Sequence, residues 1–235
     1  MTPRVVVPDT NILLAVGFGE AVDSQEPTAR AGLAEVREVG VPIIVPPSVV
    51  AELERKLAQV DSVYEFIRAT LARLGETKPL DNPLLEAERL LRSVDVGLGV
   101  PRFSNAVRRM VADTITVSPS APLAWVFAHV AGRALLMKEA IRVRSRLSYA
   151  EYTDYPEVDT SQFDPVLHGV SADDRAHLRS AAAVAERRDA TAIFLTLERP
   201  LQSAAAEASK LFPRVVVTSP FFLRGHLAQG QHPTT

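Results

Sequence analysis

The sequence predicts an α/β protein: a parallel sheet of four to five short strands, flanked by helices and interrupted by a helical insertion. Short apolar runs alternate with helical periodicity near both ends of the chain, which is typical of parallel strands joined by helical crossovers. Between them, about residues 62–170 show helical spacing without comparable strand patterns. A chain of 235 residues is long enough for one substantial core and an elaborated insertion.

The N-terminal part contains two strand patterns. Residues 4–9 form a short apolar run that ends in an acid, as expected for a buried strand, and residues 41–45 are rich in β-branched side chains. Helical spacing follows the first strand over residues 10–16 and again over 27–39, where Gly40 is a stop signal. Ser48 is expected to cap the helix after the second strand.

The C-terminal part repeats this alternation. Residues 171–187 are predicted to be helical, 191–197 a strand, 201–211 helical and 215–217 a strand. In the middle, helices are expected over 63–74, 83–94, 102–112 and 121–147, and residues 149–170 are expected to form a loop. These patterns predict an α/β domain of residues 1–60 plus 171–225, a helical insertion at 61–170 and a disordered tail at 228–235.

Composition narrows the function classes. Lys and Arg number 26 against 28 Asp and Glu, so nucleic-acid binding would require a local basic patch or a bound metal. The chain has no cysteine, which excludes disulfides and thiolate metal sites. Residues 1–7 lack a cleavage signal, and the longest apolar stretch, 123–137, is shorter than the roughly 20 residues of a membrane span. We therefore expect a cytoplasmic protein without a membrane partner.

Four acids lie where a parallel α/β sheet binds its ligands, beyond the carboxyl ends of the strands. Asp9 ends the first strand, Glu52 lies in the helix after the second, Asp174 opens a later helix, and Glu198 follows the next strand. Four converging carboxylates would repel one another unless a cation neutralised them, and oxygen ligands suit Mg²⁺ or Mn²⁺. Such ions activate water for phosphodiester hydrolysis, and the count of one or two ions stays open.

Each acid also has a structural interpretation. Asp9 could cap the helix that follows it, and Glu52 and Asp174 could be acids in the first turns of helices, where the dipole favours them. Ser171 and Asp174 have the spacing of a capping box, and Glu198 could be a solvated turn residue before Pro200. The order of the four acids along the α/β pattern favours the metal site over these separate explanations.

Four segments resemble the motifs of the PIN-domain nucleases: PDTNIL at residues 8–13, VPPSVVAEL at 45–53, DDRAHLRSAA at 173–182 and FLTLE at 194–198. The resemblance covers roughly residues 3–60 and 171–222, and Glu198 stands where the family usually has Asp. It implies a five-stranded parallel sheet and a Mg²⁺- or Mn²⁺-dependent nuclease that often acts on RNA. Asp9, Glu52, Asp174 and Glu198 would be the metal ligands and catalytic residues, supported by Asn11, Thr196 and Asp173.

A basic stretch in the expected insertion is the strongest candidate for RNA contact. Its positive residues are Arg133, Lys138, Arg142 and Arg146, and helical spacing would place the last two on one face. A solvated helix face explains the same pattern equally well. RNA is the expected partner, with an antitoxin or other protein partner and a homodimer as further expectations. The alternatives are a DNA- or structure-specific nuclease and a catalytically weak PIN-like module that binds RNA or a protein.

Overall fold

The computed structural model describes residues 2–18, 25–74, 82–98, 101–158, 167 and 169–228. These residues form two compact units: unit 1 consists of Met1–Glu54 and Ala140–Thr235, and unit 2 of Arg55–Glu139. The expected tail at 228–235 lies, after Ala228, outside the described residues.

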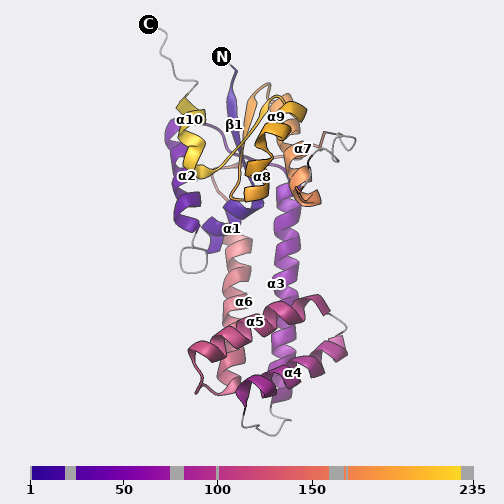
Figure 1. The fold of residues 1–235 in the computed structure, drawn as a ribbon. Coiled ribbons are helices and arrows are strands. Elements are labelled where there is room, and N and C mark those ends of the chain that lie inside the picture. The colour runs from indigo at the N-terminus through magenta and orange to yellow at the C-terminus, as the bar shows by residue number, and fades with distance from the viewer. Residues whose placement is uncertain are drawn as a thin grey trace. The chain divides into compact units, whose positions relative to one another are not determined.

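Unit 1 is an α/β structure with small parallel sheets. Strands β1 (Arg4–Pro8), β4 (Thr191–Leu195) and β5 (Val215–Thr218) form a three-stranded parallel sheet in the order β1-β4-β5. Figure 1 shows how this sheet places β1 beside the strands of the C-terminal part of the chain. Strands β2 (Ile44–Val45) and β3 (Glu151–Tyr152) form a second parallel pair. A parallel bridge between Val6 and Ile43 connects this pair to β1.

Helices flank the strands of unit 1. In chain order they are α1 (Thr10–Phe18), α2 (Glu26–Val39), the start of α3 (Pro47–Leu74), the π-helix η1 (Ala140–Arg144), α7 (Ala172–Arg187), α8 (Arg199–Ser203), α9 (Ala205–Leu211), the 3-10 helix η3 (Pro220–Phe222) and α10 (Leu223–Ala228). Helix α2 ends at Val39 and is followed by the predicted stop signal, Gly40, which has a φ of 74° that glycine adopts without strain.

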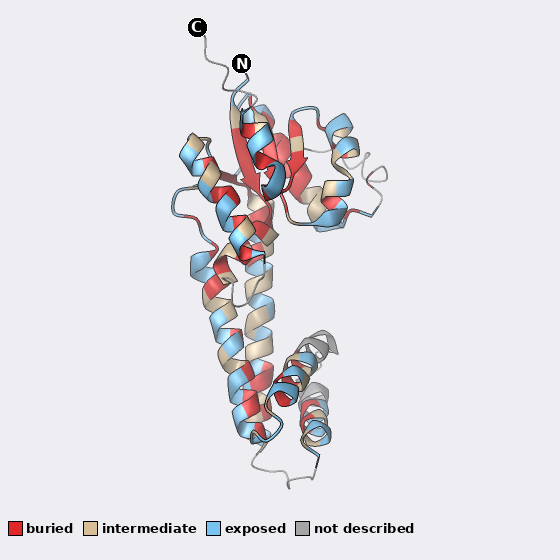
Figure 2. Cartoon of the chain, turned by 60° about the vertical axis from the view of Figure 1, so that its left-hand side comes forward, coloured by how far each residue is buried: buried red, intermediate tan, exposed pale blue. Residues whose placement is uncertain are grey.

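The core of unit 1 fixes the position of α7 against the sheet. Val7 of β1 and Phe194 of β4 are fully buried, and the strands are drawn largely in the buried colour in Figure 2. Helix α7 contributes Leu178 and the small residues Ala181 and Ala185 to the same core. Small side chains allow a helix backbone to approach a sheet closely. The packing therefore holds the first turns of α7 at the edge where β1 and β4 end.

Unit 2 is helical, in agreement with the prediction for the middle of the chain. It contains the later part of α3, α4 (Pro83–Leu98), α5 (Pro101–Val117) and α6 (Leu123–Glu139). Its core includes Phe66, Leu90 and Phe127, which are each no more than 1% exposed. Among the described residues, no helix is both long enough and apolar enough to cross a membrane.

The boundaries of the helical part differ from the sequence-based ones at 60/61 and 170/171. Unit 2 ends at Glu139, because η1 packs against α1 and β3 pairs with β2, which ties residues 140–152 to unit 1. At the other boundary, α3 continues without interruption from Pro47 to Leu74, a stretch with no glycine or further proline after its first residue. Ser48 is not the N-cap, because the helix already begins at Pro47, a residue suited to a first helical position.

Candidate metal centre

Asp9 lies at the centre of the site. It directly follows β1, its side chain is 2% exposed, and its carboxylate is surrounded by hydrogen-bond donors. The backbone N–H of Thr10 donates to Oδ1 over 2.7 Å. Nδ2 of Asn11 donates to Oδ2 over 2.6 Å, and the hydroxyl of Thr196 donates to the same oxygen over 2.7 Å. A carboxylate that accepts several such bonds is held in one orientation.

Parallel pairing explains why Asp9 and Thr196 meet. Pro8 of β1 is in register with Leu195 of β4, so the residues that follow the two strands lie side by side. Asn11 strengthens the connection, since its Oδ1 accepts the backbone N–H of Leu197 over 3.0 Å. The structure therefore brings Asn11 and Thr196 to Asp9, as the sequence suggested. Asp173 is exposed on the first turn of α7.

His177 is a site residue that the sequence analysis missed. It is 1% exposed, and its Nδ1 lies 3.0 Å from Oδ1 of Asp9. Its Nε2 lies 3.4 Å from Oε2 of Glu52. Burial opposes the charged form, but the hydrogen bond and charge of Asp9, with the charges of Glu52 and Asp174, raise the pKa of His177 above its usual value. The sequence signal was the i, i+3 spacing from Asp174, which places both residues on one face of α7.

Asp174 enters the site from the first turn of α7. Ser171 caps this helix, because its side chain accepts the backbone N–H of Asp174 over 3.1 Å, as the capping-box spacing predicted. The pKa of Asp174 is raised, first by partial burial and then by the charge of Asp9, against the opposing effects of Ser171 and His177. The Asp174 carboxylate is stabilised by the dipole at the N-terminus of α7. It also lies close enough to Asp9 for the two negative charges to repel each other.

Glu52 and Glu198 complete the acidic cluster from two further elements. The side chain of Glu52, on α3, is 15% exposed and faces His177. Glu198 is more exposed, and its backbone N–H donates to Oγ1 of Thr196 over 3.0 Å. Partial burial and the charges of Asp174, Asp9 and Glu52 raise the pKa of Glu198, while a hydrogen bond with Asn11 opposes the shift. The charges of all four predicted acids therefore interact around Asp9 and His177.

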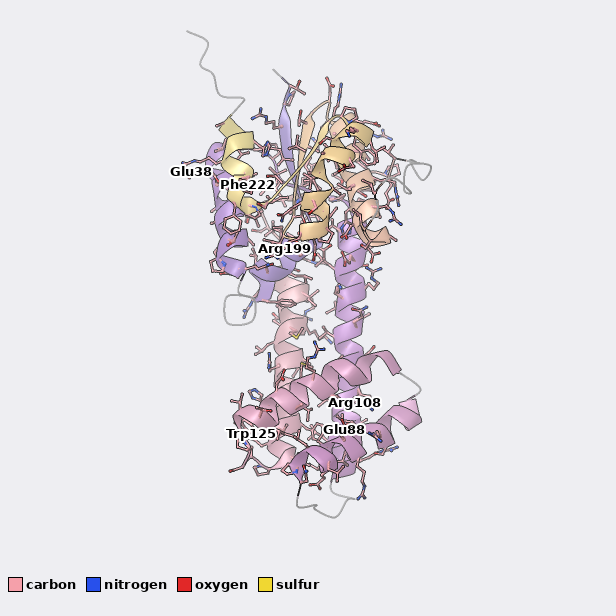
Figure 3. The ribbon with its side chains drawn as sticks, viewed as in Figure 1. Glu38, Glu88, Arg108, Trp125, Arg199 and Phe222 are labelled. Atoms are coloured by element: carbon pink, nitrogen blue, oxygen red, sulfur yellow. The ribbon has the colours of Figure 1, made fainter. Side chains whose placement is uncertain are left out.

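Within the part of the chain that the structure describes, Asp9, Asp174 and His177 form a group that could hold a metal ion. One ligand atom from each of them lies within 4.8 Å of the others. Oxygen ligands suit Mg²⁺ or Mn²⁺, and an imidazole nitrogen is a common ligand for transition ions. Glu198 lies at the exposed side of the cluster, and Arg199 after it begins α8, as labelled in Figure 3.

The residues of the predicted basic stretch belong to two different compact units. Arg133 and Lys138 belong to unit 2, and Nζ of Lys138 forms a salt bridge of 2.5 Å with Asp61. Arg142 and Arg146 are exposed and belong to unit 1. The prediction that these two arginines share a helix face is wrong, because the π-helix ends at Arg144 and Arg146 lies in the turn that follows.

Comparison with models of protein families, with curated proteins and with solved structures found no match to this chain.

Proposed function

We propose that this chain is a metal-dependent PIN-type nuclease that hydrolyses RNA phosphodiester bonds at the cluster of Asp9, Glu52, Asp174 and Glu198. The observation that carries the proposal is the convergence of these acids from separate elements. Partial burial and the neighbouring carboxylates raise the pKa values of Asp174 and Glu198, so the cluster attracts positive charge. Asp9 is buried, and buried charged groups in proteins are paired with an opposite charge or coordinate a metal.

The arrangement of the strands supports the PIN-type assignment. The three-stranded sheet β1-β4-β5 and the pair β2-β3 are both parallel, and an isolated parallel bridge links Val6 of β1 to Ile43, the residue before β2. The motif resemblance implies one five-stranded parallel sheet, and the parallel direction of all five strands supports the proposal. The site lies at the carboxyl ends of β1 and β4, where open α/β sheets bind ligands.

The residues of the chain have distinct roles in this proposal. Thr10, Asn11 and Thr196 hold the carboxylate of Asp9 in place, so that its orientation does not change when a ligand arrives. Asp9 and Asp174 would hold the ion. Glu52 lies next to the ring of His177, with Oε2 3.4 Å from Nε2. When bound, a divalent ion supplies the positive charge that stabilises the phosphate and activates water. The more exposed Glu198 would face the substrate side of the cluster.

Hydrolysis of labelled RNA and DNA oligomers of the same sequence, with Mg²⁺, Mn²⁺ or a chelator, tests the proposal. We expect cleavage of RNA only with a divalent ion, and its loss in Asp9→Asn. Equal cleavage of DNA would favour the DNA- or structure-specific nuclease. The absence of metal-dependent cleavage of either polymer would contradict the nuclease assignment.

The second candidate is a catalytically weak PIN-like module that binds RNA or a protein partner. The exposure of Glu198, together with its longer side chain in place of the usual Asp, favours this alternative. It predicts RNA binding without turnover in the same assay.

Two expected partners have their own tests. Growth arrest on expression, lost in Asp9→Asn, would support a toxin with an antitoxin partner in the cytoplasm. Light scattering would report a homodimer.

A further inference from the structure

We propose that His177 is a nitrogen ligand of the bound ion and makes the site prefer Mn²⁺ and related divalent transition ions over Mg²⁺. This inference rests on the proposed function in one respect, namely that the cluster binds a divalent ion. It goes further because oxygen ligands alone leave the choice between Mg²⁺ and Mn²⁺ open. The motif resemblance assigns acids only and gives His177 no role.

The position of His177 fits a ligand. Its ring is buried between Asp9 and Glu52, and it lies on the same face of α7 as Asp174. Two ligand atoms at right angles around an ion, each about 2.1 Å from it, are about 3 Å apart. The 3.0 Å between Nδ1 of His177 and Oδ1 of Asp9 matches this separation. Ligand atoms of Asp174 and the other two residues also lie within 4.8 Å of one another.

The surroundings of the ring also suit metal binding. Histidine ligands usually have their second nitrogen held by a carboxylate, which fixes the orientation of the ring. Nε2 of His177 is 3.4 Å from Oε2 of Glu52, so Glu52 is placed for this supporting role while Nδ1 faces Asp9. Of the groups that contact Asp9, the imidazole is the one that most commonly binds metal ions.

Ligand chemistry then predicts the preference between ions. Mg²⁺ is bound through oxygen and keeps several waters, whereas imidazole suits transition ions. A site of two carboxylates and an imidazole nitrogen should therefore bind Mn²⁺ more tightly than Mg²⁺. The alternative role for His177 is to orient Asp9 and Glu52 through hydrogen bonds without contacting the ion. That role predicts no dependence of the ion preference on the ring.

The test uses the full chain, titrated calorimetrically with Mn²⁺ and Mg²⁺ at pH 7.5. We expect the wild type to bind Mn²⁺ at least about 10-fold more tightly than Mg²⁺. His177→Asn should lose most of that preference, with a much smaller effect on Mg²⁺. His129→Asn, an exposed histidine of unit 2, is the matched control and should retain the preference. Thermal unfolding without metal shows whether His177→Asn is folded.

A second measurement needs no variant. Electron spin echo spectroscopy of the Mn²⁺-loaded wild type should detect the coupling of a directly bound imidazole nitrogen, and ¹⁵N-histidine labelling should change it. Metal binding without this coupling would overturn the inference about His177 and leave the proposed function standing. Failure of both ions to bind the wild type would overturn the inference and the proposed function together.

Discussion

Nδ1 of His177 lies 3.0 Å from Oδ1 of Asp9, although the two residues are 168 positions apart in the chain. Asp9 is placed by the end of β1, and His177 by α7, whose small residues pack against the sheet. The contact therefore joins the N-terminal and C-terminal parts of unit 1 at the site. Neither part alone can assemble the cluster, because Asp9 comes from one and Asp174 and His177 from the other.

Asp9→Asn should abolish function and also destabilise the protein without metal. Loss of a supporting contact lowers metal affinity or activity about 10- to 100-fold, so loss of this ligand should lower hydrolysis by at least about 100-fold. The amide nitrogen of the variant would take the place of Oδ1 or Oδ2. It would then face, donor to donor, a group that donates to that oxygen in the wild type. Relief of repulsion acts in the opposite direction, but lost bonds to a charged group cost about 1.5–3 kcal/mol.

Urea unfolding with a chelator and an RNA cleavage assay measure the two effects of Asp9→Asn. Asp113→Asn is the matched control, because Asp113 is exposed on α5 in unit 2. Wild-type cleavage by Asp9→Asn would remove Asp9 from the catalytic site. An unchanged free energy of unfolding would show that its hydrogen bonds do not contribute net stability.

The metal-free protein should lose stability at the site as the pH rises. The pKa values of Asp174, Glu198 and His177 are all raised in the folded state. Each group therefore stabilises the fold below its unfolded pKa, about 4 for the carboxyls and 6.5 for the histidine, and this contribution is lost as the pH rises through the folded pKa. Asp174→Asn should accordingly gain stability relative to the wild type between pH 4.5 and 8.

Thermal unfolding of the wild type and Asp174→Asn across this range, with a chelator, checks the sign. The difference in Tm between the two proteins should shift in favour of the variant at higher pH. Saturating Mn²⁺ should reverse the order at pH 8, because the ion stabilises only a protein that binds it. A difference that moves towards the wild type as the pH rises, without metal, would contradict the pKa shift of Asp174.

Ser171→Ala should weaken both α7 and the site. The Ser171 side chain accepts the backbone N–H of Asp174, and loss of such a cap costs about 0.5–2 kcal/mol. Fraying of this first turn would displace the Asp174 carboxylate, so Mn²⁺ affinity should fall as well. Ser171→Asn preserves a capping side chain and should retain both properties. Equal unfolding midpoints for Ser171→Ala and the wild type would show that the cap is dispensable.

The strands that sequence patterns could predict are those with their own buried apolar residues. Residues 4–9 and 191–197 were identifiable because they are buried from Val5 to Asp9 and from Ala192 to Thr196, and β1 and β4 lie within them. Strand β3 was missed because it has only two residues, both exposed. Its strand conformation comes from pairing with β2, a contact between distant segments that no local pattern records.

The site was predictable to the extent that its acids follow strands or open helices. Asp9 and Glu198 were found by their place after β1 and β4, and Asn11 by its place in the same motif. His177 was missed because its role depends on the contact with Asp9, and a histidine in a helix has no metal signature by itself. The three-residue spacing from Asp174 would have identified it only if the inward face of α7 were known.

Glu198 should tolerate shortening but not removal. Its backbone N–H is fixed by Thr196, so Glu198→Asp retains the carboxylate on the same anchored backbone. We expect this variant to retain or raise RNA cleavage, whereas Glu198→Ala should lower it about 10- to 100-fold. Cleavage rates at saturating Mn²⁺ provide the measurement, with Glu207→Ala on α9 as the control. An alanine variant at position 198 with the wild-type rate would make Glu198 a bystander.

Arg142 and Arg146 should supply RNA affinity through phosphate contacts. The chain carries a net charge of −2 and four of its acids gather at the site, so a polyanion requires local positive charge. Both arginines are exposed in unit 1, and η1, which contains Arg142, packs against α1, the helix that follows Asp9. A Cβ at Gly17 of α1 would lie 2.9 Å from the carbonyl oxygen of Ala140, so this packing is close.

Replacing Arg142 and Arg146 together with Glu should weaken RNA binding for all sequences. Each lost phosphate contact lowers the slope of log affinity against log salt by about one unit, so the slope should flatten by about two. Fluorescence anisotropy at several salt concentrations measures this, and the double Lys variant, which retains the charge, should keep most of the slope. Mn²⁺ affinity should persist, because neither arginine is a ligand. If RNA affinity and its slope are unchanged in the double Glu variant, these arginines are merely solvated, and the RNA must approach the acids over another surface.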